Sequence, residues 1–374
     1  MIEIKPVQTS KEIKEFIEFP LKLYKGNPYF VPPLYGDEKK MFRKGFVYED
    51  TCESVFFNAY KDGRICGRIQ GILQKAANEK NNEKRVRFTR FDAIDDSEVA
   101  EKLFSAVENW ALAKGMDTVV GPLGYSDLER EGLLIEGFDQ LSTFEEQYNA
   151  EYYGRLIEDL GYKKEVDWVE SRLRYPKEGF DERIFVLEEK LLKRFKLHFS
   201  SAKNVNEFLD KYVDMFFELL DRSYANIYGT VPFTARMKKM MVDNFKLIVD
   251  LRFVTVLLDE NEKVVALGLC FPSIGKAVQK SGGRLTIPTL LRLLKAIKKP
   301  KSIDLGLIGV EPELMNLGLG TAIVAEVAKI LKNTGVEYAE TNLNLEHNTA
   351  IRSMWKYFDS IEHKRRRSYV KTLI

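Results

Sequence analysis

Two stretches of the chain repeat the same order of apolar and polar positions. Residues 55–73 (VFFNAYKDGRICGRIQGIL) predict two strands joined by a turn at Asp62 and Gly63, and residues 253–271 (FVTVLLDENEKVVALGLCF) predict two strands joined by a polar turn. After each hairpin we expect a further strand and a helix, and each half closes with a helix and a final strand, at 149–175 and 348–373. The repetition predicts two copies of one α+β unit.

The pattern is interrupted near residues 176–185 (PKEGFDERIF), which contain a proline and a glycine. A chain of 374 residues also fits about two domains of typical size. We therefore expect one domain over residues 1–178 and a second over residues 179–374.

One loop of the second half combines residues that suit ligand binding. An apolar strand at 301–310 leads into a loop with Gly318 and Gly320, and then into a helix with an apolar stripe at 323–331. Glycines let a ligand approach the backbone, and the unpaired amides of a helix N-terminus attract an anion. The alternative is that the glycines only ease a tight turn. The loop lacks the GK[ST] of a P-loop and the third glycine of a dinucleotide fingerprint.

The composition narrows the class of protein. With 45% hydrophobic and 30% charged residues the chain is typical of a globular protein, and its net charge of +2 gives no global argument for nucleic acid. The N-terminus has no apolar signal core and no run approaches the length of a membrane-spanning helix, so we expect a cytoplasmic protein. The three cysteines and three histidines are dispersed, which argues against a disulfide framework and a metal site.

Several of these segments resemble a known superfamily. Residues 310–320 (VEPELMNLGLG) are similar to the acyl-CoA loop of the GCN5-related N-acetyltransferases (GNATs), and residues 348–355 (NTAIRSMW) resemble their closing motif, which Asn149 and residues 160–162 (LGY) match in the first half. Residues 27–34 (NPYFVPPL) and 120–123 (VGPL) are similar to a bacterial group of tandem acetyltransferase-like proteins. The resemblance implies an α+β fold of two tandem GNAT-like domains, each a mixed, mostly antiparallel sheet flanked by helices.

The resemblance also implies that the second copy binds acetyl-CoA or another acyl-CoA as co-substrate. The pantetheine arm would pair with the splayed end of the strand before the loop, and the pyrophosphate would lie on the amides of residues 316–321. Asn348 would cap the last helix or contact the arm. The expected cofactor-binding residues are Ile308, Val310, Met315, Asn316, Gly318, Leu319, Gly320, Thr321 and Asn348.

Two positions depart from the superfamily pattern. Met315 stands where Arg or Gln is usual, and Trp355 stands where a Tyr commonly serves as general acid; an indole cannot donate its proton to a thiolate at neutral pH. An amine would attack the thioester directly, so a proton must be removed and the leaving thiolate protonated. The candidates for these roles, each of which also has a purely structural interpretation, are Tyr228, Glu346, His347 and Asp304.

The corresponding loop of the first copy, residues 92–98 (DAIDDSE), has no glycine and four acidic residues. Acidic residues suit a helix N-terminus that binds no anion. We expect Ser97 or Asp96 to cap the following helix, and the first copy to be a degenerate GNAT-like domain. An insertion at 272–301 predicts a basic amphipathic helix, for which a lid or an inter-domain cover is favoured over contact with a membrane.

The sequence thus predicts an N-acyltransferase that moves an acyl group from acyl-CoA to a small-molecule or peptide amine, without a metal and without nucleic acid. One alternative is a non-catalytic acyl-CoA-binding or regulatory protein of the same fold. Another is an activity similar to the aminoacyl transferases of cell-wall synthesis, which also pair two such domains but use aminoacyl-tRNA. The near-neutral charge offers no evident tRNA surface.

Overall fold

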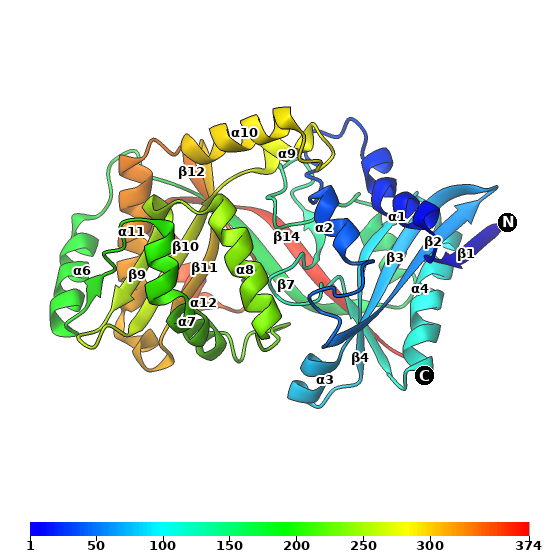
Figure 1. Ribbon diagram of the computed structural model, residues 1–374, viewed down its shortest axis with the longest axis horizontal. Helices are drawn as coiled ribbons and strands as arrows, with labels where there is room; N and C mark the ends of the chain where they lie inside the picture. Colours follow the sequence, from blue (N-terminus) through cyan, green and yellow to red (C-terminus); the bar gives the residue numbers. More distant parts are fainter. Residues whose placement is uncertain (374) are drawn as a thin grey trace. The chain divides into compact units, whose positions relative to one another are not determined.

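The computed structural model describes residues 1–373, apart from the side chain of Asn316, and the chain divides into two compact units (Figure 1). Unit 1 consists of residues 1–168, 275–292 and the C-terminal residues from Lys364 onward, and unit 2 of residues 169–274 and 293–363. Each unit is thus assembled from separate stretches of the chain. The boundary at 178/179 stays a prediction about the two repeated copies.

The helices and strands follow one another in the repeated order. Those of residues 1–174 are β1 (Ile2–Pro6), α1 (Ser10–Leu23), α2 (Tyr35–Lys40), β2 (Cys52–Lys61), β3 (Arg64–Gln74), α3 (Lys75–Asn81), β4 (Arg85–Ala93), α4 (Ser97–Ala113), β5 (Thr118–Gly121), β6 (Leu133–Glu136), α5 (Tyr153–Glu158) and β7 (Lys163–Arg174). Those that follow are α6 (Glu182–Arg194), β8 (His198–Phe199), α7 (Val205–Ser223), α8 (Ala235–Ile248), η1 (Leu251–Phe253), β9 (Val254–Leu258), β10 (Val264–Pro272), α9 (Gly275–Gln279), α10 (Ile287–Lys298), β11 (Ser302–Val310), η2 (Pro312–Leu317), α11 (Leu319–Asn333), β12 (Tyr338–Thr341), β13 (Asn344–Leu345), α12 (Thr349–Met354), η3 (Trp355–Tyr357) and β14 (Asp359–Thr372).

Both predicted hairpins are present. β2 pairs with β3 and β9 with β10, both antiparallel, and the first turn has Asp62 and Gly63 at φ values of 51° and 73°. Positive φ at both central residues is the geometry that joins two twisted strands tightly. In each copy two or more antiparallel pairs are followed by one parallel pair, β4 with β5 and β11 with β12.

Two equivalent glycines let the helix of each copy approach its sheet. A Cβ on Gly67 of β3 would lie 2.8 Å from Leu103 of α4, and a Cβ on Gly268 of β10 would lie 3.1 Å from Ile323 of α11. Contacts this short leave no room for a side chain, so glycine is required for close helix-to-strand packing. The same solution at the same place supports two copies of one fold.

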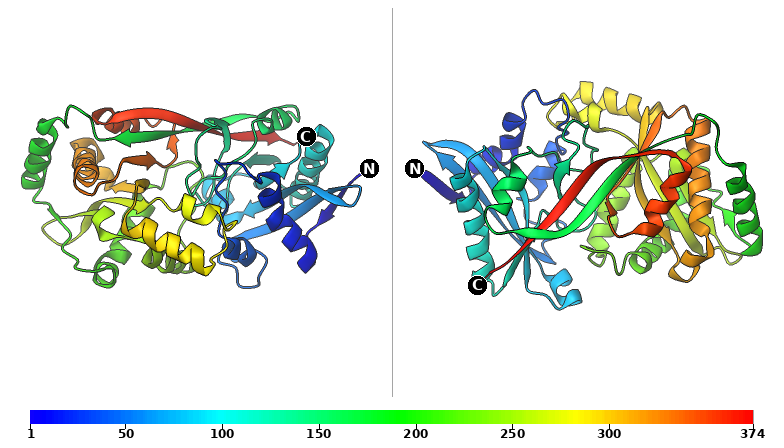
Figure 2. Two further views of the ribbon diagram at one scale, coloured as in Figure 1. Left: turned by 90° about the horizontal axis from the view of Figure 1, so that it is seen from above. Right: turned by 180° about the vertical axis from the view of Figure 1, so that it is seen from behind.

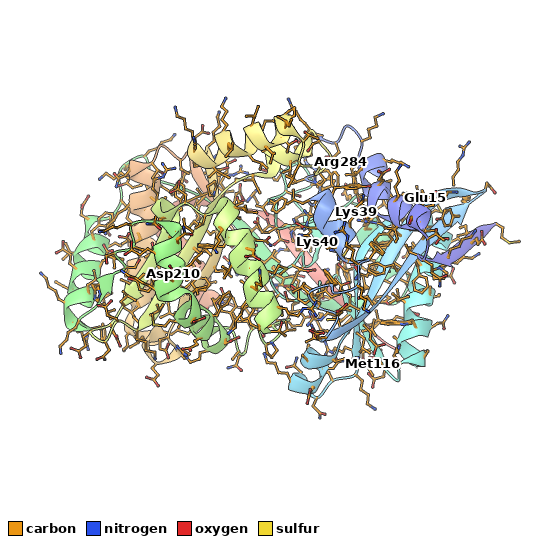
Figure 3. The ribbon with its side chains drawn as sticks, in the orientation of Figure 1. Glu15, Lys39, Lys40, Met116, Asp210 and Arg284 are labelled. Carbon is orange, nitrogen blue, oxygen red and sulfur yellow. The ribbon has the colours of Figure 1, made fainter. Side chains whose placement is uncertain are left out.

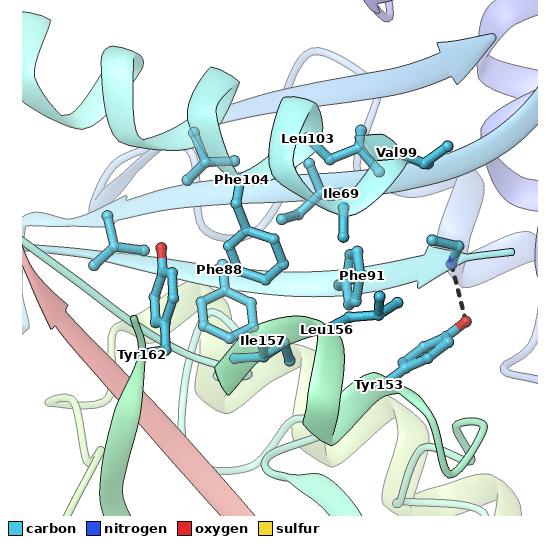
Figure 4. Close-up of a cluster of buried hydrophobic side chains, with 14 of the residues drawn as sticks. Ile69, Phe88, Phe91, Val99, Leu103, Phe104, Tyr153, Leu156, Ile157 and Tyr162 are labelled. Atoms are coloured by element: carbon cyan, nitrogen blue, oxygen red, sulfur yellow. Dashed lines mark hydrogen bonds between the residues drawn. The ribbon is translucent and has the colours of Figure 1, made fainter. Parts of the chain in front are cut away.

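The main core of unit 1 lies between α4 and the sheet, as Figure 4 shows. The ring of Phe104 from α4 meets those of Phe88 and Phe91 from β4 edge-on, each at 4.9 Å between centroids. At the end of β4, the amide of Ala93 donates to the hydroxyl of Tyr153 at 2.9 Å.

The sheet of unit 2 carries an apolar core on each face. One core contains α7 and α8 side chains such as Phe217 and Phe245, packed against Leu267 and Leu269 of β10. Cores on the other face contain residues of α6 and α11 such as Leu191 and Ile323. This two-sided burial explains the apolar character of the central strands.

The strands β7 and β14, the long green and red ribbons of Figure 2, each contribute to both units. β7 belongs to unit 1 up to Trp168 and to unit 2 from Val169. The C-terminal part of β14 pairs antiparallel with β5, with Tyr369 opposite Gly121. The last strand of the second copy therefore completes the sheet of unit 1.

Candidate functional site

In unit 2, the neighbouring strands β11 and β12 pair over four residues only. Their parallel register runs from Ser302 opposite Tyr338 to Leu305 opposite Thr341, although β11 continues to Val310. On its other edge, β11 stays paired with β10 as far as Val310 opposite Ala266. Within the described part of the chain, the last five residues of β11 thus have a strand partner on one edge alone.

A β-bulge between β10 and β11 lies at the point where β11 parts from β12. The register between β10 and β11 jumps from Leu269 opposite Leu307 to Cys270 opposite Leu305, so Gly306 is an extra residue. As a result, Leu305 packs in the core with α11, whereas Leu307 packs against the core with α7. A Cβ on Gly306 would lie 2.5 Å from the ring of Phe271, so only glycine fits.

Helix α11 begins beside this strand end without a side-chain cap. Its N-cap is Gly318, in the left-handed region at φ 88°. In unit 1 the equivalent helix α4 is capped by Asp96, as predicted; its carboxylate accepts from the amides of Glu98 and Val99 at 3.0 and 3.4 Å. The positive end of α4 is therefore neutralised by the chain itself, whereas that of α11 has no side-chain cap.

Met354 of α12 covers the first turn of α11. A Cβ on Gly320 would overlap the methyl group of Met354, and the Met354 sulfur would lie 3.2 Å away. The glycine therefore has a packing reason that holds with or without a ligand. Methionine is flexible, so its side chain can move aside.

The other predicted cofactor-binding residues lie on this same stretch. Val310, Leu319 and Gly320 are buried, whereas Met315 exposes 54% of its surface. The side chain of Asn316 lies outside the described residues. The role of these residues in binding a cofactor stays a prediction.

Asn348 and Trp355 both have structural partners. Asn348 is the N-cap of α12, and its side-chain oxygen accepts from the amide of Ile351 at 3.2 Å. Trp355 is buried, and its indole N–H donates to the side chain of Asn344 at 2.8 Å. The indole therefore stabilises the fold at the position where a general acid is common.

The predicted proton-transfer candidates lie on three different elements. Asp304 is buried on β11, two residues before the bulge, and pairs in register with Glu340 of β12. Glu346 follows β13 and is mostly buried, with the exposed ring of His347 at 3.4 Å. Tyr228 is half-buried in the loop between α7 and α8. Beyond Leu305, β11 has no partner strand among the described residues on the side of β12, and we call this place the opening between β11 and β12. Asp304 is the candidate closest to it in sequence.

Two groups of unit 2 were not predicted from the sequence. The hydroxyl of Tyr224, at the end of α7, donates to the carbonyl oxygen of Ile308 at 3.1 Å and lies 3.4 Å from its amide nitrogen. The bond shows that the polar backbone groups of Ile308 point away from β10. Nothing in the sequence joins two residues that are 84 positions apart.

The second missed group is a buried chain of charged residues. Glu340 accepts from Arg172 at 2.8 Å, and its other oxygen lies 2.5 Å from Nε2 of His363. The Nδ1 atom of His363 is buried and has no hydrogen-bond partner among the described residues. Since a carboxylate only accepts, a neutral His363 carries its proton on Nε2 and its lone pair on Nδ1. Such a tautomer is a proton acceptor.

The cysteines are not set up as nucleophiles. All three are buried and unpaired as thiols. Burial, assisted by the nearby charge of Asp304, raises the pKa of Cys270 to about 12. A thiol with so high a pKa is not ionised near neutral pH.

The equivalent opening in unit 1 is closed by its own chain. β4 and β5 pair in parallel over three residues, and beyond them the amide of Leu123 donates to the carbonyl oxygen of Phe88 at 2.9 Å. The sequence analysis placed Asp92 in the loop after the strand, but the structure places it at the last but one position of β4. It is buried, paired with Arg68 at 2.8 Å, and bonded by the hydroxyl of Tyr24 at 3.0 Å.

A polar pocket lies next to these residues in unit 1. Arg90 forms three hydrogen bonds of 3.0–3.2 Å with Glu38 in its wall. Burial lowers the pKa of Arg130, another wall residue, to about 10. The wall of this pocket thus contains a tightly paired arginine and glutamate.

Within residues 1–373, no group of three or more His, Cys, Asp and Glu side chains is placed to hold a metal ion. No helix in the same range is both long and apolar enough to cross a membrane.

Comparison with known proteins places this geometry in context. No protein-family model matches the chain. Two curated relatives are each 26% identical: "Protein YghO" of Escherichia coli (strain K12), over 97% of this chain and 93% of that protein, and "Bacterial ceramide synthase" of Caulobacter vibrioides, over 100% and 98%.

Several similar solved structures are named as GNAT proteins. A tandem GNAT protein from the clavulanic acid biosynthesis pathway matches 100% of this chain and 98% of its own, at a TM-score of 0.57 and 11% identity. A GNAT from Sphaerobacter thermophilus matches 99% and 95%, at a TM-score of 0.50 and 12% identity. The chain therefore has the tandem fold of the GCN5-related N-acetyltransferase superfamily, and the predicted fold class is confirmed.

Proposed function

We propose that unit 2 binds acyl-CoA and transfers its acyl group to an amine. The observation that carries this proposal is the unpaired edge of β11 next to the uncapped start of α11. A strand edge offers hydrogen bonds to the amides of a pantetheine arm, and a free helix N-terminus offers backbone amides and a positive dipole to a pyrophosphate.

The residues present fit this ligand through backbone groups. Ile308 turns one donor and one acceptor into the opening, which matches one amide of a pantetheine arm. At α11, the amides of Leu319 and Gly320 are the proposed pyrophosphate contacts, because the amide of Thr321 already donates to the carbonyl oxygen of Gly318 at 2.9 Å. Met315 is exposed and supplies no charge, so affinity rests on the main chain more than in relatives with an arginine there.

The proposed reaction needs one proton acceptor and one proton donor. As the amine nitrogen bonds to the acyl carbon, the carbon–sulfur bond breaks, the amine loses a proton and the thiolate gains one. Asp304 of β11 and Glu340 of β12 lie on the two strands beside the opening, and His363 of β14 contacts Glu340; these are the proposed acceptors. Tyr224, whose hydroxyl already lies in the opening, is the proposed donor, alongside Tyr228 and Glu346.

The named relative suggests which substrates to try first. A ceramide is the amide of a fatty acid and a long-chain amino alcohol, and the relative named for its synthesis covers the whole chain at 26% identity. We therefore propose a long-chain amino alcohol as the first acceptor and long-chain acyl-CoA as the first donor, with acetyl-CoA and short amines as the comparison.

Release of free CoA thiol from each acyl-CoA, with and without each amine, tests the proposal. We expect amine-dependent thiol release that falls strongly in Asp304→Asn or His363→Gln. Hydrolysis alone, or no release at all, would contradict acyl transfer.

A non-catalytic acyl-CoA-binding protein is the second candidate. It is favoured by Trp355, whose indole stands where a general acid is common, cannot protonate a thiolate at neutral pH, and donates its N–H to Asn344. Tight CoA binding without turnover of any donor–amine pair would support this candidate over the first.

A further inference from the structure

The segment that contains α9 and α10 has a charge unlike that of the rest of the chain. The whole sequence has 58 basic and 56 acidic residues, but residues 275–301 contain no acidic residue. Their eight basic residues are Lys276, Lys280, Arg284, Arg292, Lys295, Lys298, Lys299 and Lys301.

The apolar stripe of α10 faces outward. Ile287, Leu290, Leu291 and Leu294 expose 76%, 45%, 64% and 54% of their surfaces, and they follow a spacing of three and four residues along one helix face. Thr289, on the other face, is fully buried. Leu293, Ala296 and Ile297 are half-buried, so the inward side of α10 is largely apolar, and large apolar residues also lie on its exposed side.

Contacts within unit 1 hold the start of this helix in that orientation. Arg292 donates to the carbonyl oxygen of Ala277 at 3.1 Å and to the hydroxyl of Thr289 at 2.9 Å. Arg284, labelled in Figure 3, pairs with Glu18 of α1 at 2.8 Å, and its guanidinium lies 4.0 Å from the ring centroid of Tyr35. The exposed stripe is therefore a fixed feature of the surface.

The sequence favoured a lid or an inter-domain cover for this segment, and that role stays a prediction. Single exposed apolar residues are normal on a protein surface. A stripe of four on one helix, followed by Lys295, Lys298 and Lys299, is typical of a surface that binds a partner. We propose that α10 binds the surface of an anionic phospholipid bilayer, with its apolar stripe in the interface and its lysines at the lipid phosphates.

Flotation of the full chain with lipid vesicles tests this proposal. We expect the protein to float with vesicles of phosphatidylcholine mixed with phosphatidylglycerol, to float less with phosphatidylcholine alone, and to be partly released by high salt. The variant Leu290→Gln/Leu291→Gln/Leu294→Gln should lower the partition coefficient by about tenfold or more. The variant Lys295→Glu/Lys298→Glu/Lys299→Glu should abolish the preference for anionic vesicles.

Matched controls separate the helix from general surface effects. Leu247→Gln removes an equally exposed leucine of α8, and Lys193→Glu/Lys332→Glu/Lys356→Glu reverses three exposed lysines outside α10. Both should bind vesicles like the wild type, and circular dichroism should show all variants folded. No flotation by the wild type, or equal loss in the controls, would overturn the proposal. Self-association that disappears in the leucine variant, without vesicle binding, would overturn it in favour of a dimer interface.

Discussion

The hydroxyl of Tyr224 lies on the backbone of Ile308, donating to its carbonyl oxygen at 3.1 Å and standing 3.4 Å from its amide nitrogen. These two backbone groups are the donor and acceptor that we assign to the pantetheine arm. The tyrosine therefore occupies in the free protein the place that an amide of the ligand would take.

Tyr224→Phe should bind CoA more tightly than the wild type. Without the hydroxyl, the ligand no longer displaces a hydrogen bond of about 0.5–1.5 kcal/mol, so the dissociation constant should fall by about two- to tenfold. Isothermal titration calorimetry measures the change. Weaker binding by the variant would mean that the hydroxyl contacts the ligand directly. If the hydroxyl also protonates the thiolate, turnover should fall while affinity rises.

Substitutions at Gly320 should separate packing from binding. Gly320→Ala should lower the free energy of unfolding by less than about 1 kcal/mol, because the added methyl meets only the flexible end of the Met354 side chain, and Met354→Ala should remove this contact. The double variant should still bind CoA, since the amides remain.

In the Met354→Ala background, Gly320→Val should place a branched side chain at the proposed pyrophosphate contacts. Loss of two charge-assisted hydrogen bonds of about 1.5–3 kcal/mol each would weaken CoA binding roughly a hundredfold or more. Unfolding in urea and calorimetric titration of the same four proteins check both effects. Normal binding by the valine variant would remove α11 from the site.

Two neighbouring aspartates of unit 1 should respond in opposite ways. Asp92→Ala leaves buried Arg68 without its carboxylate and should cost about 3–5 kcal/mol of unfolding free energy. Asp95 is half-exposed and pairs with Arg155 at the surface, so Asp95→Ala should change stability by less than about 0.5 kcal/mol. Urea unfolding compares the two, and equal effects would show that the Arg68–Asp92 pair is not buried.

Glu188 should make the stability depend on pH. Burial raises its pKa to about 7, against the attraction of Lys329 at 2.7 Å. An acid whose pKa is higher in the folded state binds its proton more tightly there. The stability that protonated Glu188 contributes is therefore fully present below about pH 4.5 and is lost as the pH rises to about 7.

Relative to Glu188→Gln, the wild type should therefore lose unfolding free energy between those two pH values, by at most about 3 kcal/mol. Urea unfolding of both proteins across this range measures the difference. A difference that stays constant with pH would mean that Glu188 is ionised throughout.

Most of the helices and strands could be predicted, because the signals for each lie within a few consecutive residues. The Asp62–Gly63 turn, the glycine loop before α11 and the cap at Asp96 each depend on a few consecutive residues, and all three are found. The insertion at 272–301 was predicted as an amphipathic helix, and α10 is that helix.

Features that depend on long-range packing could not be predicted. Tyr224 reaches Ile308, Met354 covers Gly320, and Asp92 pairs with Arg68 only because distant segments fold together. The exposure of Leu290, Leu291 and Leu294 depends in the same way on how α10 packs. The assignment of acyl-CoA to the second copy stays a prediction.

Hydrogen exchange measured by mass spectrometry, with and without CoA, tests that assignment most directly. It needs no substitution and reads the two copies in one experiment. We expect CoA to slow exchange in peptides covering residues 306–322, where β11 ends and α11 begins, and to leave residues 92–99 unchanged. Protection at 92–99, or no protection at 306–322 under saturating CoA, would contradict the account.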